Sequence, residues 1–334
     1  MKKNPIILIV YILSLLITAC GSKENNDSEQ ISTTGDPAID ELTGKIEANP
    51  NDPSLYAARG GLFYEKEGYD EAIADLQKAL SIDSTNVDYL HVLADVYLDY
   101  YQSRQALETM EKAVNFYPQR IPTLLKYSEF QLILKKYEDS MRTIDRILRI
   151  DPQNANAYLL FGMNFKETGD TIRAINSFQK SVELDPDLID SWINLGQLHA
   201  SIGSKLATRF FDNAILIDPK NVEALHAKAD FLQDKNDLSG AIELYKQIAI
   251  LDPQYEEAYF NAGLLYLDLD SIAQARQQFD FAIKVDPTFV AAYYYRGVAS
   301  EFQGNVAQAR ADYEQALKLA PDYKQAQEAL QNLE

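Results

Sequence analysis

Residues 256–289 read EEAYFNAGLLYLDLDSIAQARQQFDFAIKVDPTF and set the pattern for most of this chain of 334 residues. The segment contains two stretches with apolar and small residues at helical spacing, and Asp286-Pro287 closes it. The closing position recurs at intervals of 34 residues, with one interval of 33, at Pro50, Ser84, Pro118, Pro152, Pro186, Pro219, Pro253, Pro287 and Pro321. A fixed period of this length is typical of an array of stacked helical units rather than one globular core.

The period divides the chain into eight helix-turn-helix units, flanked by a shorter helix at each end. We place the units at 53–86, 87–120, 121–154, 155–188, 189–221, 222–255, 256–289 and 290–323. Residues 37–52 are expected to form an N-terminal half-repeat helix, and residues 324–334 a polar C-terminal capping helix. The polar cap favours a monomer.

Large and small residues recur at fixed positions in these units. The fourth position is large and carries Tyr56, Leu90, Leu124, Tyr158, Trp192, Leu225, Tyr259 and Tyr293. The eighth position is small and carries Gly60, Ala94, Ser128, Gly162, Gly196, Ala229, Gly263 and Gly297. In the second half, a small residue such as Ala275 precedes a large one, Phe279, by four positions. Small side chains let two helices approach to about 8 Å, and large neighbours fill the remaining space.

On these positions the chain resembles the tetratricopeptide repeat over residues 53–323. The resemblance implies an all-α solenoid, a right-handed superhelix whose first helices line a concave wall. Gly169, Gly203 and Gly304 fall in the inter-helix turn, where a positive φ is useful. The unit 121–154 has Ser128 and Ser140 at small positions and Gln131 at a usually apolar one, so we expect looser packing there. The unit 189–221 lacks one residue before Ala207, which predicts a shortened turn, and either unit is a candidate bend.

The N-terminus reads as a targeting segment. Two lysines precede the apolar run 6–17, which is too short to span a bilayer and has the length of a secretory signal. The run ends in Ile17-Thr18-Ala19-Cys20, which resembles a bacterial lipobox. The resemblance implies a lipoprotein signal peptide at 1–19 and a lipid-modified Cys20, the only cysteine in the chain; an ordinary signal peptide is the alternative.

Residues 20–36 are polar and are expected to form a flexible tether from the lipid anchor to the array. The predicted location is the bacterial cell envelope. Gly21 at the second mature position favours the outer membrane, on its periplasmic face or at the cell surface.

The chain is strongly acidic. Lys and Arg total 31 against 50 Asp and Glu, a net charge of −19. Nucleic-acid binding requires a basic surface that displaces counterions, so we expect no nucleic-acid partner. A hydrophobic content of 46% is typical of a folded protein.

The resemblance places positions 2, 5, 9, 12 and 13 of each first helix on the concave wall. Acidic residues dominate these positions: Glu65, Asp88, Asp95, Asp99, Glu129, Glu167, Asp190, Glu223, Asp230, Asp234, Glu257, Asp268 and Glu301. Lys166 is the only Lys or Arg there, and apolar residues such as Phe260 and Tyr294 lie among the acids. Such a wall suits a basic or amphipathic protein segment. The alternative is a passive spacer with a solvated acidic surface, whose aromatic residues belong to inter-repeat packing.

One histidine pattern occurs twice at helical spacing. Asp88, His91, Asp95 and Asp99 share one face, and His226 lies among Glu223, Asp230 and Asp234 in the same way. Each face offers an imidazole and carboxylates for a cation, or a histidine whose pKa is raised. A cation- or pH-responsive regulatory module is therefore an alternative function, although we assign no metal ligands.

No catalytic motif appears, so we expect neither an enzyme nor a bound cofactor. The third histidine, His199, occupies a packing position beside Trp192. Some tetratricopeptide proteins hold a C-terminal carboxylate with a clamp of Lys, Asn and Arg. Here Lys126, Asn194 and Asn261 read as isolated polar groups, which predicts no such clamp.

Overall fold

A computed structural model describes residues 35–333, which form eighteen α-helices and no strand. The predicted signal peptide, Cys20 and nearly all of the tether lie outside these residues. The helices are α1 (Pro37–Ala48), α2 (Pro53–Glu65), α3 (Tyr69–Ile82), α4 (Val87–Asp99), α5 (Ser103–Phe116), α6 (Ile121–Ile133), α7 (Tyr137–Ile150), α8 (Ala155–Glu167), α9 (Thr171–Leu184), α10 (Ile189–Ser201), α11 (Ala207–Ile217), α12 (Val222–Asp234), α13 (Leu238–Leu251), α14 (Glu256–Asp268), α15 (Ile272–Val285), α16 (Val290–Phe302), α17 (Val306–Leu319) and α18 (Lys324–Asn332).

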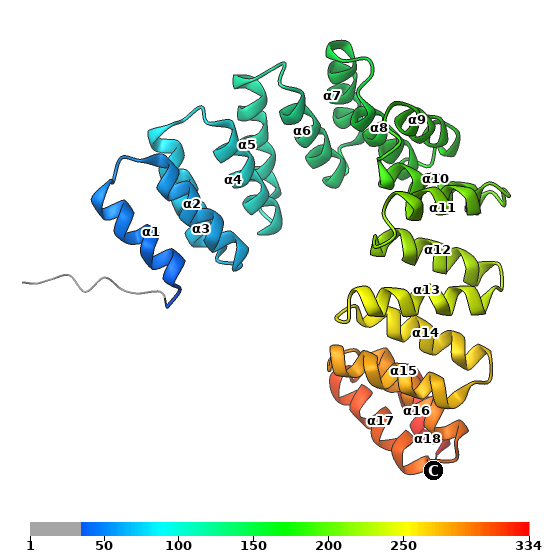
Figure 1. The fold of residues 1–334 in the computed structure, drawn as a ribbon. Coiled ribbons are helices and arrows are strands. Elements are labelled where there is room, and N and C mark those ends of the chain that lie inside the picture. The colour runs from blue at the N-terminus through cyan, green and yellow to red at the C-terminus, as the bar shows by residue number, and fades with distance from the viewer. Residues whose placement is uncertain (1–34, 334) are drawn as a thin grey trace, which may run out of the picture.

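The even-numbered helices from α2 to α16, here called the first helices, begin at the positions where the repeat period starts each unit. The odd-numbered helices from α3 to α17 are the second helices. Successive helices pack antiparallel along one continuous solenoid (Figure 1). The expected all-α solenoid is confirmed.

Local sequence sets where these helices begin and end. Asp286 shows how second helices end: it takes an extended conformation before Pro287, as sterics before proline require. Its carboxylate then accepts from the backbone N–H of Thr288 at 2.7 Å. Several first helices begin with a side-chain cap, such as Asn221, whose Oδ1 accepts from the N–H of Ala224 at 2.8 Å.

The turn between the two helices of each unit contains one residue in the left-handed region. Gly169, Gly203 and Gly304 occupy it as expected, with φ of 80°, 69° and 73°. The other five units place a side chain there: Glu67, Tyr101, Lys135, Asn236 and Asp270. The turn therefore requires a left-handed residue everywhere, although glycine supplies it in only three units.

The small eighth position touches the large residue of the second helix. A Cβ built on Gly263 would lie 2.6 Å from Cε1 of Phe279, far inside van der Waals contact. A Cβ built on Gly162, Gly196 or Gly297 would likewise lie too close to an aromatic ring of the second helix. Only hydrogen fits at these four positions, because the ring fills the space that a methyl group would need.

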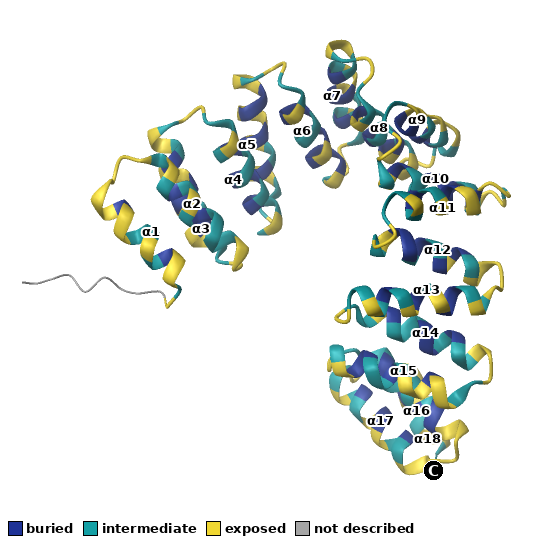
Figure 2. Cartoon of the chain, in the orientation of Figure 1, coloured by how far each residue is buried: buried dark blue, intermediate teal, exposed yellow. Residues whose placement is uncertain are grey.

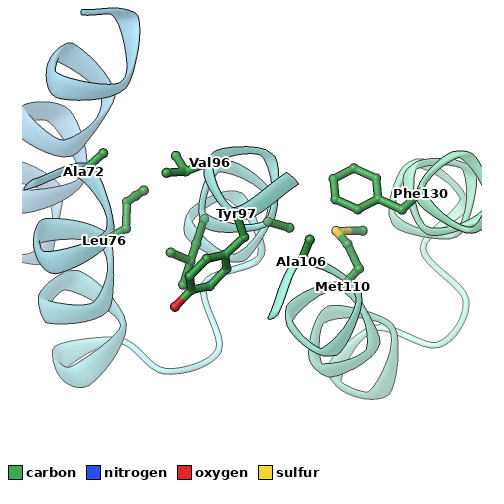
Figure 3. Packing of buried hydrophobic residues seen from close by; sticks show 9 residues of the cluster. Ala72, Leu76, Val96, Tyr97, Ala106, Met110 and Phe130 are labelled. Atoms are coloured by element: carbon green, nitrogen blue, oxygen red, sulfur yellow. The ribbon is translucent and has the colours of Figure 1, made fainter. Parts of the chain in front are cut away.

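The core runs continuously through the array, and no unit has a core of its own. Every described helix contains buried residues, and exposed residues gather at the turns between helices (Figure 2). One cluster joins Leu76 of α3, Tyr97 of α4, Met110 of α5 and Phe130 of α6 across three units (Figure 3). Stability therefore depends on contacts between neighbouring units.

The array bends in its middle. Helices α1–α6 form one arm and α11–α18 another, and the two arms meet around α7–α10 (Figure 1). The expected shortened turn of the unit 189–221 was wrong: residues 202–206 separate its helices, where other units use three residues. Helix α11 has 11 residues instead of 14, and these three residues account for the one that the unit lacks and the two that its turn gains. Starting α11 late keeps buried Ala207 in register and Phe211 against Gly196.

The unit 121–154 compensates for its polar residues by hydrogen bonding them to one another. Ser128 and Ser140 are fully buried, with their hydroxyl oxygens 2.9 Å apart, and Ser140 donates to the Ser128 carbonyl. Gln131 accepts from Thr143 at 2.8 Å. Asn164 of the next unit donates to the Ser140 hydroxyl at 2.9 Å. These bonds tie α6, α7 and α8 together at the bend, because buried polar groups are stable only when paired.

Candidate functional site

We call the surface formed by positions 2, 5, 9, 12 and 13 of the first helices the first-helix wall. First helices of neighbouring units contact one another directly, as α2–α4, α6–α8, α10–α12 and α14–α16 do. No pair of second helices within residues 35–333 is joined as extensively. Closer spacing of the first helices places them on the inner side of the curved array.

The predicted acidic residues of this wall are solvent-accessible. Glu65, Asp88, Asp99, Glu129, Glu167, Asp190, Glu223, Asp230, Asp234, Glu257 and Asp268 are exposed, and Asp95 is half-buried. Nine of them form no ion pair with any described residue: Glu65, Asp99, Glu129, Glu167, Asp190, Glu223, Asp234, Glu257 and Asp268. The wall therefore presents a largely uncompensated negative charge.

Some of the predicted groups are engaged in pairs that the sequence did not indicate. Lys126 is not isolated: its Nζ lies 2.6 Å from Oδ1 of Asp95. Burial nevertheless raises the pKa of Asp95 above its usual range, against the effect of Lys126. Asp99 accepts from the hydroxyl of Tyr64. These carboxylates help to hold neighbouring first helices together, so they are poor positions for testing partner binding.

The expectation that Asn194 and Asn261 are isolated was also wrong. Lys166 donates to Oδ1 of Asn194 at 2.7 Å and to Oε1 of Gln197 at 2.9 Å. The side-chain Nδ2 of Asn261 lies 3.4 Å from Nε2 of His226. Both asparagines therefore serve contacts between units.

The two histidine faces are not equivalent, contrary to their sequence pattern. His91 contacts the hydroxyl of Thr123 at 3.2 Å. Burial, together with Lys126 and Arg120, lowers the pKa of His91 to about 4. A raised pKa was one hypothesis for this residue, and it is wrong because burial and the charges of Lys126 and Arg120 outweigh the effect of Asp88.

The second face does pair its histidine with a carboxylate. Nδ1 of His226 lies 3.2 Å from Oδ2 of Asp230, and this hydrogen bond raises the pKa of His226 despite burial. Oδ1 of Asp230 accepts from the hydroxyl of buried Tyr245 at 2.5 Å. Across the described chain, His, Cys, Asp and Glu side chains nowhere gather in threes in an arrangement suited to a metal ion. The cation hypothesis is therefore not supported for either face.

The aromatic residues predicted for the wall pack against neighbouring rings, within their own unit and across to the next. The ring of Phe260 lies 4.7 Å from that of Phe289 and 5.7 Å from that of Tyr295. Tyr294 lies 5.6 Å from Tyr323 in the same way. Both Phe260 and Tyr294 are half-buried, so their apolar surface is largely used by the fold.

His199 occupies the expected packing position, with its ring 4.7 Å from that of Phe210. Burial lowers the pKa of His199, which favours the neutral imidazole.

Sequence reasoning missed a pocket at the bend. It has a volume of about 250 Å³ and lies between the ends of α6 and α8, with Ile133, Met163, Lys135 and Lys166 in its lining. Ile133 is 53% exposed and Met163 is 37% exposed. A signal was present: Ile133 occupies position 13, where five other units carry Glu65, Asp99, Glu167, Asp234 and Asp268.

Comparison with known proteins agrees with this architecture. Profiles of the tetratricopeptide repeat match residues 60–99, 155–188 and 260–324, which confirms that the chain contains these repeats. The crystal structure of the APC/C hetero-tetramer Cut9-Hcn1 aligns with 89% of this chain and 58% of that chain, with a TM-score of 0.54 and 17% identity. At this identity the likeness shows the fold alone. Tetratricopeptide repeat proteins mediate protein–protein interactions, and their solenoids are typically non-enzymatic.

Curated relatives match only in part. BBSome complex member BBS4 of Bos taurus is 26% identical over 119 residues, which are 35% of this chain and 23% of that protein. Protein O-mannosyl-transferase TMTC1 of Homo sapiens is 24% identical over 187 residues, 53% of this chain and 21% of that protein. The chain thus spans less than a quarter of the length of these relatives. Within residues 35–333, no helix has the length and apolar character that a membrane crossing requires.

Proposed function

We propose that this chain is a membrane-anchored scaffold that binds a basic or amphipathic segment of another protein on its first-helix wall. The observation that carries the proposal is the row of exposed carboxylates without ion pairs, such as Glu167, Asp234 and Asp268, along the inner side of the array. Gathering like charges on one surface is unfavourable for the isolated protein. A basic partner relieves that repulsion and is also steered towards the wall.

The anchor in this proposal is a lipid on Cys20, joined to the array by the tether that ends at Asp36. A flexible chain of this length has a root-mean-square reach of about 20–24 Å. The wall would therefore work close to a membrane surface, on a partner that is itself in or near the envelope. Metabolic labelling with a palmitate analogue tests the anchor: label should enter the wild-type chain and be lost from a Cys20→Ser variant.

Crosslinking capture from envelope membranes tests the wall. The bait is the full-length chain, compared with Asp234→Lys/Asp268→Lys, which changes two exposed wall carboxylates that form no ion pair. The matched control is Glu243→Lys/Glu314→Lys, which makes the same charge change on exposed residues of second helices α13 and α17. A partner captured by wild type and control, but not by the wall variant, supports the proposal. Identical capture by all three baits contradicts it.

Salt dependence separates this proposal from a passive spacer. A partner held by the acidic wall should dissociate as salt rises, because screening weakens exposed charge pairs. Capture that is unchanged between low and high salt removes the electrostatic part of the proposal.

A pH-responsive module is a second candidate, favoured only by the His226 face. There the imidazole, Asp230 and Tyr245 join α12 to α13 through hydrogen bonds. Partner capture compared at pH 6 and pH 8, in wild type and His226→Gln, tests it. A pH response that is the same in both proteins excludes a regulatory role for His226.

A further inference from the structure

The pocket at the bend differs chemically from the rest of the first-helix wall. Its floor and sides include Ile133 at the end of α6 and Met163 in α8, both exposed to solvent. A volume of about 250 Å³ is below the usual range for small-molecule and cofactor sites and suits a single side chain. Ile133 also lines the adjoining hollow beside Leu98 and Tyr101, so the apolar surface continues along the wall.

The charge of the pocket is opposite to that of its surroundings. Two cations, Lys135 and Lys166, and one anion, Glu167, line it, which leaves a net charge of +1. Neither lysine forms an ion pair with a described residue. The wall on both sides carries exposed acids, with Asp99 on α4 and Asp234 on α12.

Lys166 is held in place by neutral acceptors. Its Nζ donates to the side-chain oxygens of Asn194 and Gln197, at 2.7 and 2.9 Å. An ammonium has three N–H donors, so one remains for a ligand. Desolvation by the surrounding residues lowers the pKa of Lys166, and the approach of a carboxylate would offset that loss.

We propose that this pocket receives an aliphatic side chain of the partner segment, and that an acidic side chain next to it pairs with Lys166. This inference rests on the proposed function and refines its partner: a basic segment interrupted by one aliphatic-acidic pair. We assign the carboxylate to an internal Asp or Glu, because the wall continues beyond the pocket towards both ends of the array. A terminal carboxylate at the bend would leave one arm of the wall unoccupied.

Selection from a random-peptide display library on the full-length chain tests the inference. Wild type is compared with Lys166→Gln, with Ile133→Ser, and with the control Lys318→Gln, which removes an exposed lysine of α17 outside the pocket. Circular dichroism first establishes that each variant has the wild-type helix content. Wild type and control should enrich basic peptides that carry an aliphatic residue beside Asp or Glu.

The two pocket variants should lose different parts of that preference. Lys166→Gln should keep the basic and aliphatic residues and lose the acidic one, while Ile133→Ser should lose the aliphatic one. A selected peptide should bind Lys166→Gln at least about tenfold more weakly than wild type in fluorescence anisotropy, and its Asp→Asn form should bind both proteins equally. Acidic enrichment that persists in Lys166→Gln, or never appears with wild type, overturns the inference.

The same experiment keeps the two proposals apart. Selection of basic peptides without the aliphatic-acidic pair overturns the pocket inference and leaves the proposed function standing. Absence of any basic enrichment overturns both.

Discussion

Replacing Gly263 by alanine adds one methyl group at the closest approach of α14 and α15, and we expect it to destabilise the protein. The added Cβ would lie 2.6 Å from Cε1 and 2.8 Å from Cδ1 of Phe279. Carbon atoms in contact are about 3.5–4.0 Å apart, so the ring would have to move by about 1 Å. Phe279 is fully buried, with the ring of Phe260 5.8 Å away and that of Tyr295 5.9 Å away.

The expected magnitude follows from two opposing effects. Overpacking a filled core costs about 1–3 kcal/mol. Replacing a glycine inside a helix by alanine stabilises the folded protein by about 0.5–1 kcal/mol, because less backbone entropy is lost on folding. The free energy of unfolding should therefore fall by up to about 2.5 kcal/mol, and a tryptophan at this position should cost more.

Urea denaturation followed by circular dichroism measures the change, with Gly61→Ala as the matched control. A Cβ on Gly61 meets no atom within 4 Å, so this variant should gain about 0.5–1 kcal/mol from the same entropy effect. Because arrays of repeats need not unfold in one step, transition midpoints are compared before free energies are fitted. If Gly263→Ala is as stable as Gly61→Ala, steric exclusion at the eighth position is refuted.

A double-mutant cycle identifies the ring as the cause. The unit 87–120 pairs Ala94 with Met110, and both side chains are fully buried. Introducing Phe279→Met into Gly263→Ala should recover stability relative to the sum of the single changes, by about 0.5–3 kcal/mol. Strict additivity would show that the methyl group and the ring do not compete for the same space.

Three further predictions concern the turns, the histidines and the bend. Tyr101→Gly should raise the free energy of unfolding by about 0.5–1 kcal/mol in the same urea assay, because Tyr101 is 93% exposed and has φ of 58°. Thermal melts across pH should show opposite effects of the two histidines. The stabilising effect of His226 is present below its unfolded pKa near 6.5 and is lost as pH rises through its raised folded pKa. His91, with a folded pKa of about 4, instead costs stability as pH falls from 6.5 towards 4. His226→Gln should therefore be most harmful at pH 6 and His91→Gln most protective near pH 4.5; equal effects at all pH values would contradict both assignments. Ser140→Ala should destabilise by about 1–3 kcal/mol although most units carry alanine there, because it removes the buried hydroxyl that bonds both Ser128 and Asn164. An unchanged urea midpoint would show that these buried bonds contribute nothing.

The sequence predicts the helices well because each constraint is local or periodic. Small residues such as Gly263 and large ones such as Phe279 must meet within one unit, so their spacing is visible in every repeat. It predicts the turns less well, because a left-handed residue need not be glycine. Tyr101 and Lys135 carry no sequence signal for positive φ, yet the turn geometry imposes it. The late start of α11 was also invisible, since a deletion before Ala207 does not say which helix loses a residue.

The sequence predicted the negative charge of the candidate site, but it did not predict which side chains there pair with one another. Lys126 and Asp95 are 31 residues apart, and His91 and Thr123 are 32 apart, so each pair joins neighbouring units. Such pairs depend on how one unit is rotated against the next, which the period alone does not give. The same rotation brings Lys126 near His91, where its charge adds to the effect of burial in lowering the pKa of His91.

The wall carboxylates without ion pairs lie apart from the residues that pack the core, and this separation bears on function. The fold uses the buried face of each helix, and at the four glycines that touch an aromatic ring one added methyl group is excluded. The wall gains nothing from exposed carboxylates such as Glu167, Asp234 and Asp268 that form no ion pair, nor from leaving Ile133 53% exposed beside two lysines that form none. Features that oppose stability without serving packing are expected where a protein meets its ligand. The acids and the pocket lie on one surface, so a single extended partner segment accounts for both, with basic residues for the arms and an aliphatic-acidic pair for the bend.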